Sequence, residues 1–303
     1  MKIGIDVGGT NLRAAIVQGE ATLVAQHKEP VGEPRDPDTL ADRIARIVAD
    51  LAQSGNAADG EIRVGIGIAA MLRDRDGTVA NSPHLRWRDV PFGRLLAARL
   101  GERFHVGVYN DVNAIVYGEA IAGAARGCRD VLGVYVGTGI GAGLVVNGEL
   151  VDGASSCAGE LGHTKVRWDA DAAPCACGSR GCLEAYCGGS YLDRRVQSVR
   201  GRSDITLSDV DTAAAAGEDW ALGLWTETAT LLAVALGNAV ALVNPERLVL
   251  GGGVLSRCGT LLSLVETMLE VAGNSASLER LSVVPAALGD DAGLVGAAHL
   301  AAR

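Results

Sequence analysis

The chain has 303 residues, of which 48% are hydrophobic and 41 are glycine, as in a compact globular protein of one large or two smaller domains. Its net charge of −9 argues against a nucleic-acid-binding surface, which needs clustered Lys and Arg. An apolar strand pattern begins directly after Met1 and Lys2 and leaves no room for a signal peptide. We therefore expect a cytoplasmic protein whose thiols stay reduced.

The first predicted element is a β-hairpin at residues 3–20, IGIDVGGTNLRAAIVQGE. It contains an apolar strand, a Gly/Thr turn, a second apolar strand and a tight polar turn. The same order returns without a gap at residues 132–149, LGVYVGTGIGAGLVVNGE. The equal length and equal turn position favour duplication of a domain over chance similarity of two hairpins.

Strands and helices alternate along the rest of the chain, which predicts α/β layers. Between the hairpins the patterns predict helices at about 38–53 and 91–101 and strands at 63–69 and 105–110. After the second hairpin they predict mostly helices over 190–243, a strand at 247–253, a helix at about 259–272, a strand at 281–287 and a terminal helix at about 292–302.

No segment is expected to enter a membrane. The most apolar helical stretch, residues 231–243, is too short to span a bilayer and is interrupted by Gly237 and Asn238. We expect a buried core helix there, and neither a membrane nor a nucleic acid as a partner.

Two glycine-rich turns are candidate phosphate loops, DVGGTN at 6–11 and GTGIG at 137–141. Glycine lets backbone N–H groups converge on an anion, and the threonine hydroxyls add donors. Neither turn is a Walker A sequence, and glycine in a single hairpin turn is usually only a turn. Their matching positions in two duplicated domains predict a nucleotide held in a cleft between the domains. LGGGV at 250–254 could add a third backbone contact, although a tight strand-to-helix turn explains it equally well.

Two carboxylates stand at the ends of predicted strands. Asp6 ends the first strand, where it could orient a phosphate-bound Mg²⁺ through water. In YNDVNA, Asn110 and Asp111 stand where a strand ends and a helix begins. A helix N-cap explains Asp111 simply, but a carboxylate there could also serve as general base in phosphoryl transfer.

Four of the seven cysteines lie between Cys175 and Cys187, downstream of His163. The odd count and the reducing compartment disfavour a disulfide framework. Cys-x-Cys is a weak redox signal, because redox dithiols usually have Cys-x-x-Cys spacing. A metal site and a run of buried packing residues remain open.

Taken together, these motifs resemble those of the ROK family (repressors, open reading frames, kinases). GIDVGGTN, NDVNA, GTGIG, ELGH with the following Cys-x-Cys-Gly-x-x-Gly-Cys-x-Glu, and LGGGV occur in the family's order over nearly the whole chain. The resemblance implies an α/β protein with the duplicated actin-like ATPase (ribonuclease H-like) fold and a cleft between two domains. The expected domains are a small N-terminal one, 1–115, joined by the terminal helix at about 290–303, and a larger C-terminal one, 116–289, that carries a zinc site.

Enzymes of this family use MgATP to phosphorylate hexoses, and the resemblance assigns roles residue by residue. Asp111 becomes the general base that deprotonates the sugar hydroxyl. The sugar-binding residues become Asn110, Asp111, Glu160, His163 and Glu184, with Asn81 as a candidate that a turn explains at least as well. The nucleotide-binding residues become Asp6, Gly8, Gly9, Thr10, Asn11, Gly137, Thr138, Gly139, Gly251, Gly252 and Gly253.

The resemblance also assigns a structural Zn²⁺ to His163, Cys175, Cys177 and Cys182. Four N/S ligands fill a tetrahedral shell and leave no open position for catalysis. His163 would bind zinc through one ring nitrogen and offer the other to the sugar. The other cysteines are then packing residues: Cys128, Cys157, Cys187 and Cys258.

The leading hypothesis is a glucokinase that makes glucose 6-phosphate from D-glucose and ATP. N-acetylglucosamine, N-acetylmannosamine and fructose stay open as substrates, because GIAAMLRDRDGTV at 67–79 replaces the family's Gly-x-Pro-Gly-like turn. A sugar-responsive repressor is disfavoured, since the first strand starts at residue 3 and leaves no room for a DNA-binding domain. Polyphosphate is disfavoured as donor, because relatives that use it generally lack the zinc cysteines. We expect a homodimer, as is common in the family.

Overall fold

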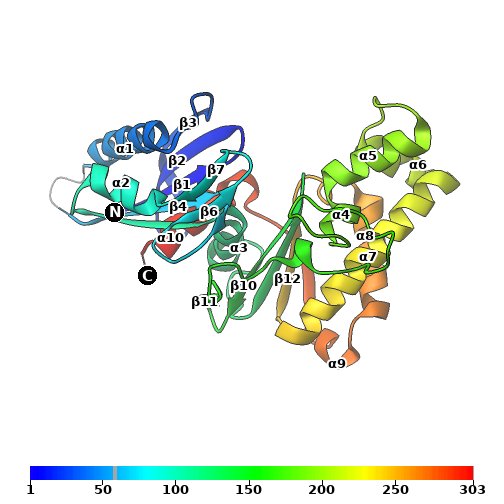
Figure 1. Cartoon of the computed structure of the whole chain (residues 1–303). Coiled ribbons are helices and arrows are strands. Elements are labelled where there is room, and N and C mark those ends of the chain that lie inside the picture. Colours follow the sequence, from blue (N-terminus) through cyan, green and yellow to red (C-terminus); the bar gives the residue numbers. More distant parts are fainter. Residues whose placement is uncertain (57–59, 303) are drawn as a thin grey trace. The chain divides into compact units, whose positions relative to one another are not determined.

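The structure is a computed structural model that describes residues 1–56 and 60–302 (Figure 1). Residue 303, the end of the predicted terminal-helix segment, lies outside the described residues. The chain divides into two compact units. The first comprises Met1–Cys128, Gly143–Gly159 and the chain from Ala287, and the second comprises Arg129–Ala142 and Glu160–Ala286. The domain boundary after residue 115 stays a prediction.

The first unit is built on a five-stranded sheet with the order β3-β2-β1-β4-β8. Its first three strands are antiparallel neighbours, and its last two run parallel to β1. The strands are β1 (Lys2–Val7), β2 (Asn11–Gln18), β3 (Thr22–Pro30), β4 (Ile62–Ile68) and β8 (Phe104–Asn110). The predicted first hairpin is therefore β1 and β2, whereas β3 was not predicted.

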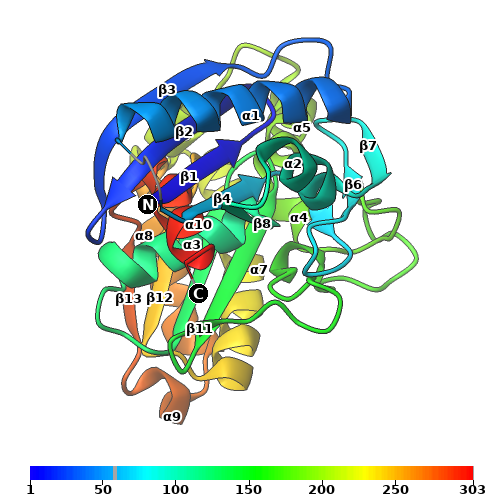
Figure 2. The ribbon, with the colours of Figure 1, turned by 90° about the vertical axis from the view of Figure 1, so that its left-hand side faces the viewer.

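Alternation along β1 assigns its two faces to different helices. Ile3 and Ile5 are fully buried in one apolar core with residues of α1 (Pro37–Ser54) and α2 (Phe92–Leu100). The other face carries α10 (Ala292–Leu300), which lies beside α3 (Asp111–Ala122) (Figure 2). The sheet is thus covered on both faces by helices, as the α/β pattern predicted.

Helix α10 approaches the sheet so closely that only glycine fits beneath it. A Cβ on Gly4 would lie 1.9 Å from the carbonyl oxygen of Leu294, and one on Gly65 would lie 1.8 Å from that of Ala297. Helix α3 is held in a second way, because the fully buried carboxylate of Glu119 accepts the backbone N–H groups of Ala287 and Leu288 at 2.9 and 2.8 Å. The chain end therefore positions α3, the helix that Asp111 begins.

A small antiparallel sheet with the order β5-β6-β7 follows β4 and was not predicted. Its strands are β5 (Met71–Leu72), β6 (Val79–Ser82) and β7 (Trp87–Val90). The fully buried Ser82 donates its hydroxyl to the carbonyl of Ala69 at 2.8 Å. The indole of Trp87 packs against Phe92 of α2, with ring centroids 4.8 Å apart.

The second five-stranded sheet repeats the first, with the order β11-β10-β9-β12-β13. Strand β12 is parallel to both its neighbours, and β11 is antiparallel to β10. The strands are β9 (Val131–Val136), β10 (Ile140–Val146), β11 (Glu149–Leu150), β12 (Arg247–Gly251) and β13 (Ser282–Pro285). In both sheets a hairpin comes first along the chain, and the later strands lie beyond the first strand of that hairpin. This shared order agrees with the duplication inferred from the two hairpins.

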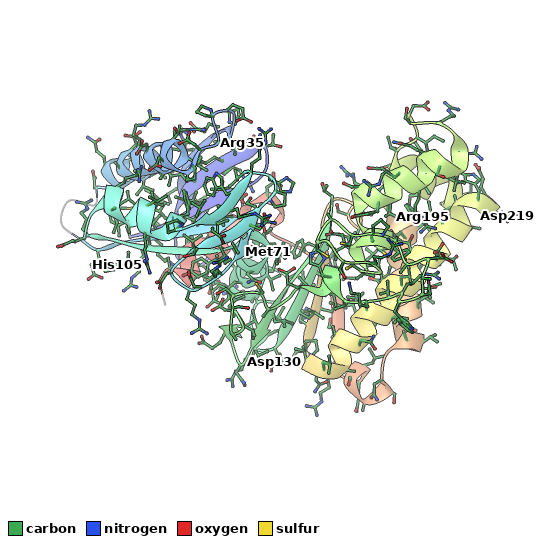
Figure 3. All side chains as sticks on the ribbon, viewed as in Figure 1. Arg35, Met71, His105, Asp130, Arg195 and Asp219 are labelled. Carbon is green, nitrogen blue, oxygen red and sulfur yellow. The ribbon has the colours of Figure 1, made fainter. Side chains whose placement is uncertain are left out.

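The remaining helices mostly follow the predicted patterns. They are α4 (Glu184–Cys187), α5 (Gly189–Arg200), α6 (Leu207–Ala215), α7 (Asp219–Val243), α8 (Gly259–Ala272) and α9 (Ser275–Leu278), with 3₁₀ turns η1 (Leu161–His163) and η2 (Gly289–Asp291). By length and composition alone α7 could cross a membrane, a test that core helices also pass. It packs against α6 and α8 in the second unit, where Leu232, Leu236 and Val240 are buried. Figure 3 shows Asp219, the first residue of α7, among the side chains of this unit.

Candidate active site

The first glycine-rich turn, residues 8–11, joins β1 to β2. The N–H of Gly8 donates to the carbonyl of Asn11 at 3.0 Å, which closes the hairpin, and Val31 donates to the carbonyl of Thr10 at 2.8 Å. The imidazole of His84 lies against Gly9, where a Cβ would be 3.2 Å from its Nδ1. A side chain at residue 9 would therefore require the His84 ring to shift slightly.

Asp6 is paired with an arginine. Arg13 lies on β2 directly opposite Asp6 of β1, and its Nη2 and Nε donate to the Asp6 Oδ2 at 2.6 and 3.2 Å. The two side chains are 19% and 18% exposed, and Asp290 lies 3.6 Å from the guanidinium. Burial raises the pKa of Asp6, while the Arg13 hydrogen bond and charge oppose that rise.

Asn110 and Asp111 lie where β8 ends and α3 begins, as predicted. The N-cap is Asn110 and not Asp111, because the Asn110 Oδ1 accepts the N–H of Asn113 at 3.1 Å. The Asn110 amide also donates to the carbonyl of Ala70 at 3.1 Å. Asp111 is the first helical residue, and its Oδ1 accepts the N–H of Val112 at 2.9 Å. Its carboxylate therefore stands at the positive end of the α3 dipole.

A pocket of about 540 Å³ in the first unit borders Asn110. Tyr109, Arg75 and Asp152 also line it. Arg75 lies 3.8 Å from the Asp152 carboxylate, whose pKa is raised by burial and partly restored by the arginine charge. Asn81 does not line this pocket; it lies on β6 between Met71 of β5 and Arg88 of β7.

The second glycine-rich turn, residues 137–141, borders a separate pocket of about 540 Å³ in the second unit. Gly189 and Ser190 at the start of α5 donate their N–H groups to the carbonyls of Gly137 and Thr138 at 2.8 and 3.0 Å. The pocket is lined by these residues together with Asp193, Gln197, Ser203, Ile205, Thr206, Leu207, Ser208, Gly253, Val254, Arg257 and Cys258. Its walls thus combine backbone groups of the glycine loop with hydroxyl, amide and charged side chains.

Of the glycines in LGGGV, only Gly253 borders this pocket. Gly252 has φ +87°, and a Cβ there would lie 2.4 Å from the Val136 carbonyl oxygen. A Cβ on Gly251 would lie 2.4 Å from the Tyr135 ring. Packing against β9 therefore accounts for two of these three glycines.

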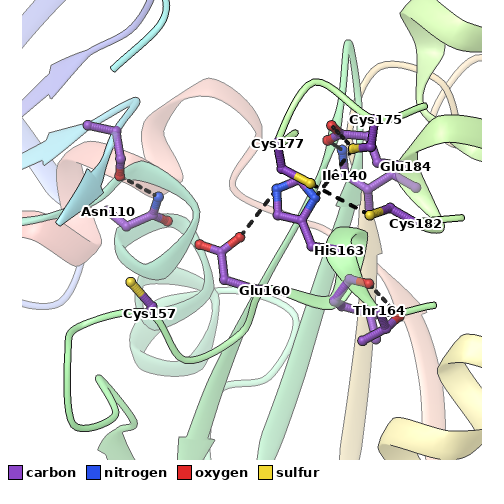
Figure 4. A network of polar contacts seen from close by, with 12 residues as sticks. Asn110, Ile140, Cys157, Glu160, His163, Thr164, Cys175, Cys177, Cys182 and Glu184 are labelled. Atoms are coloured by element: carbon purple, nitrogen blue, oxygen red, sulfur yellow. Dashed lines mark hydrogen bonds and ion pairs between the residues drawn. The ribbon is translucent and has the colours of Figure 1, made fainter. Parts of the chain in front are cut away.

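The side chains of His163, Cys175, Cys177 and Cys182 converge, and all four candidate ligand atoms lie within 4.8 Å of one another (Figure 4). The Cys177 and Cys182 Sγ atoms are 3.7 Å apart, and the Cys175 Sγ is 3.7 Å from the His163 Nδ1. A tetrahedral zinc with Zn–S bonds of about 2.3 Å places neighbouring sulfurs about 3.8 Å apart. The donor set and spacing therefore fit a zinc ion with Nδ1 as the histidine ligand.

Hydrogen bonds around the cluster hold its loops in place. The hydroxyls of Tyr186 and Tyr191 accept the N–H groups of Ala173 and Ala176, on either side of Cys175, at 2.7 and 2.9 Å. Lys165 donates to the Cys182 Sγ at 3.0 Å. Such contacts hold the candidate ligands in place, and the Lys165 ammonium would offset negative charge on thiolates that bound a metal.

Glu160 and Glu184 flank the cluster (Figure 4). The His163 Nε2 lies 3.8 Å from the Glu160 Oε2, so the ring points one nitrogen at the sulfurs and the other at this carboxylate. Burial raises the pKa of Glu160, with the His163 charge opposing and Glu184 adding to the rise. The Glu184 Oε2 accepts the N–H of Ile140 from the second glycine turn at 2.8 Å.

The family model described as "ROK family" matches residues 2–303. The chain belongs to the ROK family. A glucokinase of Streptomyces coelicolor is 32% identical, with 99% of this chain and 97% of that protein covered. The crystal structure of a ROK hexokinase from Thermus thermophilus is 28% identical, covers 98% of this chain and 97% of its own, and has a TM-score of 0.85. That of a ROK family glucokinase from Streptomyces griseus in complex with glucose and AMPPNP is 31% identical, covers 99% and 98%, and has a TM-score of 0.78.

Membership confirms the predicted fold class, the actin-like ATPase fold with two α/β domains. Within this ROK protein the predicted site residues fall into two groups. The first unit holds Asp6, Gly8, Gly9, Thr10, Asn11, Asn81, Asn110 and Asp111, and the second holds Gly137, Thr138, Gly139, Glu160, His163, the three cysteines, Glu184 and Gly251 to Gly253.

Sequence reasoning missed several contacts of these residues. Arg13 had a signal, since a hairpin with its turn at 8–10 places residue 13 across from Asp6. His84 is far from Gly9 in sequence and gave none. Cys187, predicted to be a packing residue, ends α4 and is fully buried, with its thiol directed at the Thr228 carbonyl at 3.6 Å.

Proposed function

We propose that this ROK protein is an ATP-dependent hexose kinase that converts D-glucose to glucose 6-phosphate, with Asp111 as general base. The observation that carries the proposal is the Asp111 carboxylate at the junction of β8 and α3, in a chain whose glucokinase relatives match over nearly its full length. Kinase relatives support hexose phosphorylation as the reaction class, and glucose as acceptor is the finer part of the proposal.

In this proposal the sugar-binding residues are Asn110, Asp111, Glu160, His163 and Glu184, as the family resemblance implies. Carboxylates and an amide can accept and donate hydrogen bonds to sugar hydroxyls in fixed directions. Asp111 takes the proton of the 6-hydroxyl as its oxygen attacks the γ-phosphorus of ATP, and the bond from that phosphorus to the ADP oxygen breaks. Positioning supplies most of the rate, so a base of ordinary strength suffices.

The nucleotide would occupy the pocket beside Gly137 and Thr138 in the second unit. Mg²⁺, when bound with ATP, neutralises charge on the transferred phosphoryl group. In this proposal Asp6 orients that ion through water. Arg13, which is bonded to the Asp6 carboxylate, supplies a second cationic group at the same place.

We further propose that His163, Cys175, Cys177 and Cys182 hold a structural zinc. The separations of the four ligand atoms are compatible with tetrahedral coordination, and four protein donors would leave no position for a substrate. With Nδ1 on the metal, the His163 ring is neutral and its Nε2 carries a proton, which it can donate to Glu160 or to a sugar oxygen.

A coupled ADP-release assay over glucose, N-acetylglucosamine, N-acetylmannosamine and fructose tests the activity. We expect faster turnover with glucose than with the other sugars. Preference for an N-acetylhexosamine would overturn the glucose assignment, and no turnover with any sugar would overturn the proposal that the protein is a hexose kinase.

The variant Asp111→Ala should abolish turnover, while glucose binding measured by calorimetry persists. The exposed Asp50→Ala on α1 is the matched control. Light scattering of the same sample tests the proposed homodimer.

A further inference from the structure

The second glycine turn and helix α4 make a contact that the phosphate-loop role does not require. A Cβ on Gly139 would lie 2.4 Å from the Glu184 Oε2. A Cβ on Gly188 would lie 2.9 Å from the Glu184 carbonyl oxygen, 3.1 Å from the Glu184 Cγ and 3.4 Å from the Gly139 Cα. Two glycines therefore make the space in which the Glu184 side chain lies.

Two backbone N–H groups of this turn have acceptors within the protein. Ile140 donates to the Glu184 Oε2 at 2.8 Å, and Gly137 donates to the carbonyl of Gly139 at 2.9 Å. Neither N–H points to an open anion site in this arrangement. A charged acceptor makes the Ile140 bond one of the stronger hydrogen bonds in the unit.

The two ends of the turn also face different surroundings. Gly137 and Thr138 line the pocket of about 540 Å³, whereas Gly139 and Ile140 do not. A Cβ on Gly137 would meet nothing within 4 Å, while one on Gly139 would displace the carboxylate. The first two residues of the turn therefore face the pocket, and Gly139 faces the Glu184 carboxylate.

We propose that Gly139 and the N–H of Ile140 are positioning groups for the acceptor sugar, acting through Glu184. The inference rests on the proposed function, because it takes Glu184 as a sugar-binding residue. It adds a second role to the one that the family resemblance implied for Gly139.

The decisive variant is Gly139→Ala. The overlapping atom is the end of a flexible side chain, so the protein can fold by moving the carboxylate, at the expense of the Ile140 hydrogen bond. We expect KM for the hexose to rise by about tenfold or more, with KM for ATP changed by less than about twofold. A rise confined to KM for ATP would overturn the inference.

Gly137→Ala is the matched comparison in the same turn. Its methyl group has free space in the protein but projects from a residue that lines the nucleotide pocket, so KM for ATP should rise and KM for the hexose should not. Gly223→Ala on α7, where a Cβ also meets nothing, controls for a general effect of the substitution and should leave both constants unchanged.

A double-mutant cycle with Glu184→Asp tests whether Gly139 acts through Glu184. The shorter carboxylate relieves the overlap, so Gly139→Ala should affect hexose KM much less in the Glu184→Asp background. Additive effects would overturn the inference. If Gly139→Ala alone fails to fold, a folded double variant supports the contact and an unfolded one contradicts it. A wild-type protein without hexose turnover would instead overturn the proposed function.

Discussion

Asp152 is a carboxylate that burial makes harder to ionise. Burial raises its pKa above the ordinary 3.8, and the exposed Arg75 only partly offsets this. The folded protein therefore holds the Asp152 proton to higher pH than the unfolded chain does. Its contribution to stability is greatest below pH 3.8 and is lost as the pH rises through the folded pKa.

Asp152→Asn should consequently raise Tm at pH 7 relative to the wild type. The gain should shrink toward zero as the pH falls below about 4, where both states are protonated. Calorimetric scans from pH 3 to pH 8 measure this, with the exposed Asp50→Asn as control. A gain that is the same at every pH would show that ionisation of Asp152 is not its cause.

Arg13 should stabilise the protein through Asp6. Arg13→Gln leaves a largely buried carboxylate without its cation and should lower the free energy of unfolding by about 2 kcal/mol, between the values for exposed and buried pairs. Urea unfolding measures the loss, and most of it should vanish in an Asp6→Asn background. Arg94→Gln, in a solvent-exposed pair with Asp76, is the control and should have little effect. An equal loss with and without Asp6 would rule out the pair.

At the scale of elements, polar contacts join the cysteine segment, residues 163–182, to α4 and the neighbouring helices. Cys182 is followed by Leu183, whose N–H donates to the Thr164 carbonyl at 2.9 Å, and then by Glu184 at the start of α4. The Arg195 guanidinium (Figure 3), from α5, bonds Glu227 of α7 at 2.6 Å, and Arg167 of the segment reaches the same carboxylate at 3.5 Å. Zinc in this segment would therefore fix the position of Glu184.

Cys177→Ser should accordingly lose zinc and stability together. We expect about one zinc per chain in the wild type by metal analysis, and a Tm lower by at least about 5 °C in the variant. Cys128→Ser, outside the cluster, is the control and should retain the metal. A folded wild-type protein that contains no zinc would contradict the structural role. A Cys177→Ser variant with the Tm of the wild type would contradict it as well.

At the scale of the whole molecule, the chain end is part of the first unit. Helix α10 covers one face of the first sheet and packs against α3, so residues nearly 300 positions apart share one core. The approach depends on glycine in β1 and β4, because the helix backbone lies where a side chain would stand. This packing positions the start of α3, and hence Asp111, its first residue.

Gly65→Ala tests that close approach. The new methyl group would overlap the backbone oxygen of Ala297, so α10 must shift, at a loss of about 1–3 kcal/mol or more. Gly223→Ala, with open space around it in a helix, should be neutral or stabilising by up to about 1 kcal/mol. Urea unfolding compares the two, and equal stabilities would show that α10 is not pressed against β4.

The sequence by itself determined the two hairpins and the alternation of strands and helices, because period and turn chemistry are local properties, and its resemblance to the ROK family supplied the residues of the candidate metal cluster. It missed β3, whose residues alternate between exposed and half-buried with none fully buried, and the short β5–β7 sheet, which only pairing defines. Tertiary structure alone decided that His84 lies against Gly9 and that Gly139 faces Glu184. These contacts join distant parts of the chain, where glycine signals a close approach but not the group that makes it.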